Sequence, residues 1–142
     1  MSDLLFVYVT LMQGQRNELA GMVRASWMGR ATMPGCLYDL GSYPAAKQDG
    51  AGAAGRVRGE LYRLADPEGA IAELDRYEGF DPRAPEASEF VREWVEVGLE
   101  SGGALQAWAY LYNRPVDELR LVPGGDYRAA VAARCQLPAV AR

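Results

Sequence analysis

The residue that carries the most chemical information is Glu78, a carboxylate at the end of a predicted helix over residues 66–78. The apolar stripe of this helix contains Ile71 and Leu74, and Glu78 follows them by seven and four residues. At about 100° per residue, its side chain therefore lies on the same buried face. Burial and the negative end of the helix dipole both raise the pKa of a carboxyl group there. Such a group can accept and return a proton near neutral pH; the alternative is a structural ion pair with a buried arginine such as Arg92.

A second candidate is the end of the first predicted strand, which covers residues 4–11. The strand ends in Tyr8, Val9, Thr10 and Leu11 and runs into the polar, glycine-containing segment MQGQRN. Consecutive backbone N–H groups at such a strand end can bind a carboxylate or an oxyanion without a basic side chain. The alternative is an ordinary core strand.

A third candidate is Tyr110, which alternates with Trp108 and Tyr112 along one face of a predicted strand over residues 104–112. Aromatic stripes of this kind are typical of the core of a small barrel. The hydroxyl of Tyr110 could also reach Glu78 or a substrate amide.

The composition excludes several other chemistries. The chain of 142 residues contains no histidine, which excludes serine–histidine triads, histidine-ligated zinc and imidazole acid–base catalysis. Its two cysteines, Cys36 and Cys135, form no cluster with metal-ligand spacing. The net charge of −4 argues against nucleic acid and anionic membranes as partners. We therefore expect no metal and no cofactor, and any catalysis must use carboxylates, tyrosines, hydroxyls and backbone groups.

Strands joined by hairpins, together with a few helices, position these candidates. The helix over 66–78 has the clearest ends, since Asp66 is a good N-cap, Pro67 fits the first helical position and Gly79 terminates the helix. An alanine-rich helix is predicted over 126–136, and residues 41–46 and 113–125 are expected to be irregular. Strands are predicted over residues 4–11, 26–33, 35–40, 56–64, 89–99 and 104–112. This pattern indicates the α+β class with a closed or nearly closed sheet.

The length predicts a single domain over residues 1–142. No apolar run approaches the ~20 residues of a membrane-spanning helix, and the N-terminal residues lack the basic region and cleavage site of a signal peptide. A cytoplasmic protein without membrane partners is therefore expected.

The ordered set of motifs resembles the gamma-glutamylcyclotransferase-like family, which includes the gamma-glutamylamine cyclotransferases. The segment FVYVTLMQGQRN is similar to the N-terminal signature of that family. The similarity continues in order through GCLYDLGSYPA, GELYRL, LDRYEGFDP, AWAYLYN and GDYR. The resemblance implies a small mixed β-barrel with flanking helices. It also implies that Glu78 is the catalytic acid/base and that the loop of Tyr8, Val9, Thr10 and Leu11 binds the glutamyl group.

The chemistry implied by the resemblance acts on a small molecule that carries a gamma-glutamyl group in amide linkage. The α-amine of the substrate attacks its own γ-carbonyl, which closes a five-membered ring and releases 5-oxoproline and a free amine. The nucleophile belongs to the substrate, so one carboxyl group such as Glu78 suffices for both proton transfers. The resemblance specifies neither the leaving amine nor an oligomeric state.

One residue departs from the family pattern, because Val9 stands where the family has glycine. Glycine at this position would serve a positive φ or a close approach of ligand to backbone, and valine satisfies neither without strain or a narrowed pocket. The alternative function is therefore a non-catalytic family member that binds a small carboxylate or serves as a protein-interaction domain.

Overall fold

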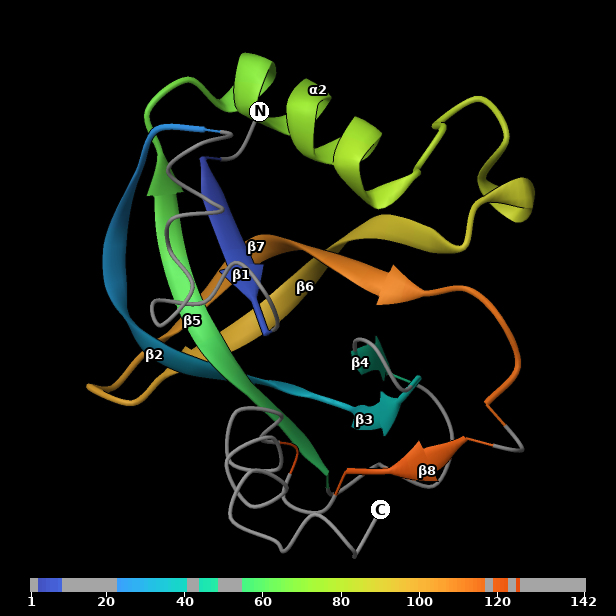
Figure 1. Cartoon of the computed structure of the whole chain (residues 1–142). Coiled ribbons are helices and arrows are strands. Elements are labelled where there is room, and N and C mark those ends of the chain that lie inside the picture. The colour runs from blue at the N-terminus through green and yellow to red at the C-terminus, as the bar shows by residue number, and fades with distance from the viewer. Residues whose placement is uncertain are drawn as a thin grey trace, which may run out of the picture.

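The computed structural model describes residues 3–8, 23–40, 44–48, 55–116, 119–122 and 125. Within these residues, five strands close into a barrel in the order β1-β5-β2-β6-β7, and the α-helix α2 covers part of its outer face (Figure 1). The barrel strands are β1 (Leu4–Val7), β2 (Ala25–Pro34), β5 (Arg56–Leu64), β6 (Phe90–Leu99) and β7 (Ala104–Tyr112). Neighbouring strands are antiparallel except β1 and β7, which pair in parallel at Leu5 and Trp108. The expected α+β class with a small mixed barrel is confirmed.

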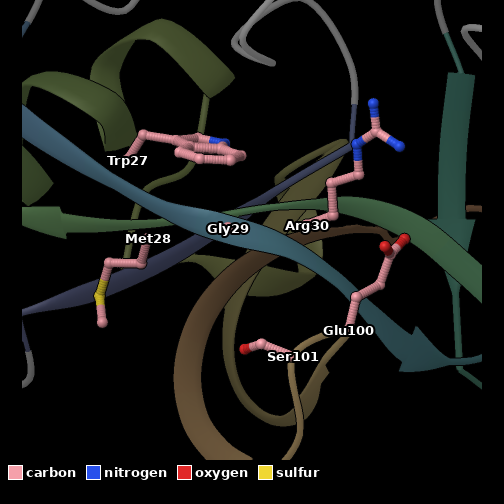
Figure 2. A pocket seen from close by; sticks show the side chains of 6 residues that line it. All are labelled: Trp27, Met28, Gly29, Arg30, Glu100 and Ser101. Atoms are coloured by element: carbon pink, nitrogen blue, oxygen red, sulfur yellow. The ribbon is translucent and has the colours of Figure 1, made fainter.

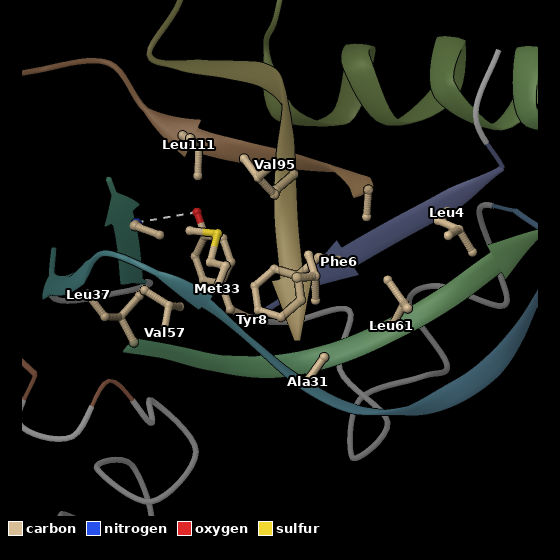
Figure 3. Packing of buried hydrophobic residues seen from close by; sticks show 14 of the residues in the cluster. Leu4, Phe6, Tyr8, Ala31, Met33, Leu37, Val57, Leu61, Val95 and Leu111 are labelled. Atoms are coloured by element: carbon tan, nitrogen blue, oxygen red, sulfur yellow. Dashed lines mark hydrogen bonds between the residues drawn. The ribbon is translucent and has the colours of Figure 1, made fainter. Parts of the chain in front are cut away.

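Alternation along each strand divides the apolar residues between two cores. In β5, Val57 and Leu61 point into the barrel, whereas Tyr62 and Leu64 lie on the outer face beneath α2. The barrel interior is filled by aliphatic and aromatic side chains, among them Phe6, Met33, Leu37, Val95 and Leu111 (Figure 3). Since successive side chains of a strand point to opposite faces, a strand that is buried on both faces carries long apolar runs such as LLFV in β1.

Helix α2 (Pro67–Glu78) has the ends that its sequence predicts. The side chain of Asp66 accepts a hydrogen bond from the backbone N–H of Gly69, and Gly79 closes the helix with a φ of 74°. This left-handed conformation favours glycine, which explains why the helix stops directly after Glu78. Ala70, Ile71 and Leu74 are buried against the outer face of the barrel, so the final turn is fixed relative to the sheet. This helix is neither long enough nor apolar enough to cross a membrane, and the described residues contain no other candidate.

A second, three-stranded sheet of order β4-β3-β8 lies beside the barrel. Its strands are β3 (Cys36–Asp39), β4 (Pro44–Lys47) and β8 (Arg120–Leu121). The expectation of irregular chain was therefore wrong for residues 44–46 and for residues 120–121. Strand β4 is built largely of proline and alanine, which have little intrinsic preference for strands, and β8 is too short to show a periodicity. Both strands therefore depend on pairing with β3.

Candidate active site

Glu78 occupies the last turn of α2 and is partly buried, on the side of the helix that faces the barrel. Burial, and to a lesser extent the negative charge of Glu89, raise the pKa of its carboxyl group to about 7. The short 3₁₀ helix η2 (Pro85–Ala87) lies between these two residues in the chain. A carboxyl group with this pKa is populated in both protonation states near neutral pH.

Arg92 does not pair with Glu78, which was the structural alternative for this carboxylate. Its guanidinium binds Asp75 instead, with Nε 2.9 Å from Oδ1 and a terminal nitrogen 3.2 Å from Oδ2. The guanidinium also lies 4.4 Å from the ring centroid of Trp108. No described residue forms an ion pair or a hydrogen bond with the side chain of Glu78. Within this part of the chain, its carboxyl group is therefore available to exchange a proton with a bound molecule.

Tyr110 lies on the outer face of β7, beneath α2 and next to Glu78. Its hydroxyl donates a hydrogen bond of 2.6 Å to Oδ1 of Asp75. Burial, the bond to Asp75 and the charges of Asp75 and Glu78 raise the pKa of this phenol, while Arg92 lowers it. Tyr110 is therefore neutral, and its only proton is directed towards Asp75.

Tyr8 follows β1 and points into the barrel, where it packs in the same core as Phe6 and Met33 (Figure 3). Its hydroxyl donates to the backbone carbonyl of Tyr110 at 2.5 Å and accepts from the backbone N–H of Ala46 at 3.3 Å. Burial raises the pKa of Tyr8, and so does the nearby charge of Glu78. The Tyr8 hydroxyl thus links β1 to β7 and β4 close to Glu78, and its hydrogen is already engaged by protein.

Val9, Thr10 and Leu11, the other predicted substrate-binding residues, lie outside the described residues. The structure brings together Glu78, Tyr8 and Tyr110, which come from α2, the end of β1 and β7. The roles of all six residues in binding or catalysis stay predictions.

Sequence reasoning missed two residues of this group, Asp75 and Glu89. The available signal for Asp75 was its spacing, since it precedes Glu78 by three residues and therefore lies on the same side of α2. Glu89 carried no local signal, because its effect on Glu78 depends on how the chain returns from α2 to β6.

A pocket of about 610 Å³ lies elsewhere, between β2 and the turn that joins β6 to β7 (Figure 2). Its lining residues are Trp27, Met28, Gly29, Arg30, Glu100 and Ser101. None of the predicted site residues lines it, so this pocket is separate from the group around Glu78. The described residues also contain no cluster of three acidic, cysteine or histidine side chains with the geometry of a metal site.

The match to a family model and the similarity to curated proteins indicate one family. Residues 5–129 match the family model described as "Gamma-glutamyl cyclotransferase, AIG2-like". The gamma-glutamylcyclotransferase family protein YtfP of Escherichia coli K12 is 33% identical over 124 residues, which cover 87% of this chain and 94% of that protein. Two crystal structures share the fold at 22% identity. The AIG2-like protein of Mus musculus has a TM-score of 0.64 with 89% of both chains covered, and YkqA of Bacillus subtilis has 0.69 with 97% of this chain and 44% of its own covered.

Proposed function

The chain belongs to the gamma-glutamyl cyclotransferase, AIG2-like family, and on that premise we propose that it releases 5-oxoproline and a free amine from a gamma-glutamyl amide. Glu78 is the general acid/base of this reaction. The observation that carries the proposal is the state of Glu78, a partly buried carboxyl group with a pKa of about 7 and no ionic partner among the described residues.

The proposed reaction needs removal of two protons from the α-nitrogen, delivery of one to the leaving nitrogen, and no protein nucleophile. The carboxylate of Glu78 takes a proton from the α-ammonium group of the substrate, and the amine nitrogen then attacks the γ-carbonyl carbon. A new C–N bond closes the ring, and the bond from that carbon to the leaving nitrogen breaks. After attack the ring nitrogen still carries two hydrogens. Glu78, which has passed its first proton to solvent, takes one of them and donates it to the leaving nitrogen. The products are therefore 5-oxoproline, a neutral amine and the proton released to solvent. A pKa near the working pH suits a group that must do both.

Tyr110 supports this assignment through the direction of its hydroxyl proton. Since that proton is donated to Asp75, the phenol oxygen can only accept a hydrogen bond from a substrate. The ammonium or amide N–H of a gamma-glutamyl group is a donor of the required kind. The backbone N–H groups of residues 9–11 are proposed to hold the glutamyl carboxylate, as oriented backbone donors do in other anion sites.

The test is to incubate the protein with a panel of gamma-glutamyl amides and peptides and to measure 5-oxoproline release. We expect turnover by the wild type and at least a ~10²-fold lower rate for Glu78→Gln, the low end of general acid–base contributions. Glu73→Gln is the matched control, since Glu73 lies on the same helix, is exposed and pairs with Arg76. A panel without turnover, combined with calorimetric binding of glutamate or 5-oxoproline, would instead assign the chain to the non-catalytic, carboxylate-binding alternative.

A further inference from the structure

The guanidinium of Arg92 is held by one carboxylate and by two aromatic rings. Its Nε and one terminal nitrogen donate hydrogen bonds of 2.9 and 3.2 Å to the carboxylate of Asp75. Its carbon atom Cζ lies 4.4 Å from the ring centroid of Trp108 and 5.6 Å from that of Phe80. Both members of the ion pair are only 13% exposed, and a two-point contact between an arginine and a carboxylate fixes their relative orientation. This group fastens the last turn of α2 to β6, which passes beneath it (Figure 1).

Two of these contacts bracket Glu78 in the chain. Asp75 precedes Glu78 by three residues, and Phe80 follows it by two. The backbone N–H of Phe80 donates a 2.8 Å hydrogen bond to the carbonyl of Asp75, and Gly79 turns the chain just before Phe80. One side chain from β6 therefore contacts both ends of the segment 75–80, and a backbone hydrogen bond joins the same two ends.

The position of Glu78 depends on this segment, because its own side chain forms no ion pair or hydrogen bond with a described residue. The residues that α2 buries end at Leu74, so beyond that point Asp75 and Phe80 continue the attachment of the chain to the barrel. Helix ends fray readily where side chains do not hold them. A group that transfers protons must lie within hydrogen-bond reach of the reacting atom, and a misplacement of about 1 Å can lower the rate by about 10²-fold.

We propose that Arg92 is a positioning residue, which holds the segment 75–80 through Asp75 and Phe80 and thereby places the carboxyl group of Glu78 for proton transfer. The proposal rests on the role given to Glu78 in the proposed function. Arginine suits this task better than lysine, because its planar fork binds a carboxylate at two points and its flat face stacks on aromatic rings. Arg92 acts through the backbone of the segment and needs no contact with the Glu78 carboxyl group itself.

The first test measures whether Arg92 holds the segment, by amide hydrogen exchange followed with ¹H–¹⁵N NMR. Arg92→Lys keeps the positive charge beside Asp75 but removes the fork and the flat face. We expect the amide of Phe80 to exchange at least about tenfold faster in this variant, because its hydrogen bond to Asp75 opens more often. The amide of Ala70, which bonds to the carbonyl of Asp66 at the start of the helix, should keep its wild-type rate of exchange.

The kinetics of 5-oxoproline release test whether the segment positions Glu78. In Arg92→Lys, kcat should fall at least about tenfold while KM changes by less than about threefold, since the proposed binding groups at residues 9–11 are not altered. Phe80→Leu, which leaves the ion pair intact, should shift exchange and kcat in the same direction by a smaller factor. Arg76→Gln is the matched control. Arg76 lies in the same helical turn but pairs with Glu73 on the exposed face, so exchange and kcat should stay at their wild-type values.

Chemical rescue distinguishes positioning from a general loss of structure. In Arg92→Ala, methylguanidinium at millimolar concentration should occupy the space beside Asp75 and restore part of kcat, whereas methylammonium, which carries the same charge, should not. Unchanged exchange at Phe80 in Arg92→Lys would overturn the proposal, and so would faster exchange with an unchanged kcat, a loss confined to KM, or equal effects of the two cations. If exchange at Phe80 responds as expected but neither wild type nor variants release 5-oxoproline, the attachment of the segment by Arg92 stands and the proposed function fails.

Discussion

The hydroxyl of Tyr8 donates a hydrogen bond to the backbone carbonyl of Tyr110, which lies 102 residues further along the chain. The same oxygen accepts from the backbone N–H of Ala46, so one side chain joins the end of β1 to β7 of the barrel and to β4 of the smaller sheet. This link holds the strand end that carries the family signature against the strand that carries Tyr110.

Tyr8→Phe should destabilise the fold, because it leaves a buried carbonyl and a buried N–H with no hydroxyl partner. We expect the free energy of unfolding to fall by about 1–3 kcal/mol, the usual cost of unsatisfied buried polar groups. Urea denaturation measures this loss. Tyr77→Phe is the control, since Tyr77 is 49% exposed and should stay within ~0.5 kcal/mol of wild type. Equal stabilities for the two variants would contradict the linking role of Tyr8.

Glu78 should make the stability of the protein depend on pH. Its pKa is about 7 in the folded state and about 4.5 when unperturbed, so between these values the folded state binds the proton more tightly. The free energy of unfolding should therefore be highest at the acidic end of this window and fall by roughly 1–3 kcal/mol as the pH rises through 7. Denaturation of wild type and Glu78→Gln at a series of pH values tests this, and the Gln variant should lack the decline. Parallel curves for the two proteins would show that Glu78 titrates normally.

The negative charge of Glu89 should contribute to the raised pKa of Glu78. Because the Glu89 carboxylate raises the pKa of Glu78, Glu89→Gln should lower that pKa and move the acidic limb of the activity profile to lower pH. The shift should be small, since Glu89 is exposed and screened by solvent. Glu86→Gln, an exposed neighbour in η2, serves as the control. An equal shift in both variants would indicate a general effect of net charge.

Val9 should limit turnover if it narrows the glutamyl site. Valine is stiff at χ1 and cannot easily turn its methyl groups away, so Val9→Gly should increase 5-oxoproline release on the same substrate panel. The variant should lose about 0.5–1 kcal/mol of stability from added chain freedom. Strong wild-type turnover that Val9→Gly fails to improve would indicate that the valine side chain points away from the substrate.

Local signals in the sequence were sufficient for α2 and for most of the barrel strands. Asp66, Pro67 and Gly79 specify the ends of the helix through contacts within a few residues, and the spacing from Leu74 puts Glu78 on the inward side. The predicted bounds of β5 and β7 agree with the structure, because alternation over nine residues is a strong local pattern.

Only the tertiary structure decided which charged side chains form ion pairs. The spacing of the sequence allowed Arg92 to pair with Glu78, yet the guanidinium binds Asp75, because the register of β6 against β7 and the crossing of α2 set which carboxylate it reaches. The parallel closure of β1 on β7 and the pairing of β4 and β8 with β3 likewise join segments with no local signal for each other. The sequence by itself determined that an inward carboxylate stands at the end of a helix. Its pKa depends on burial and on the charge of Glu89, which long-range packing brings near it.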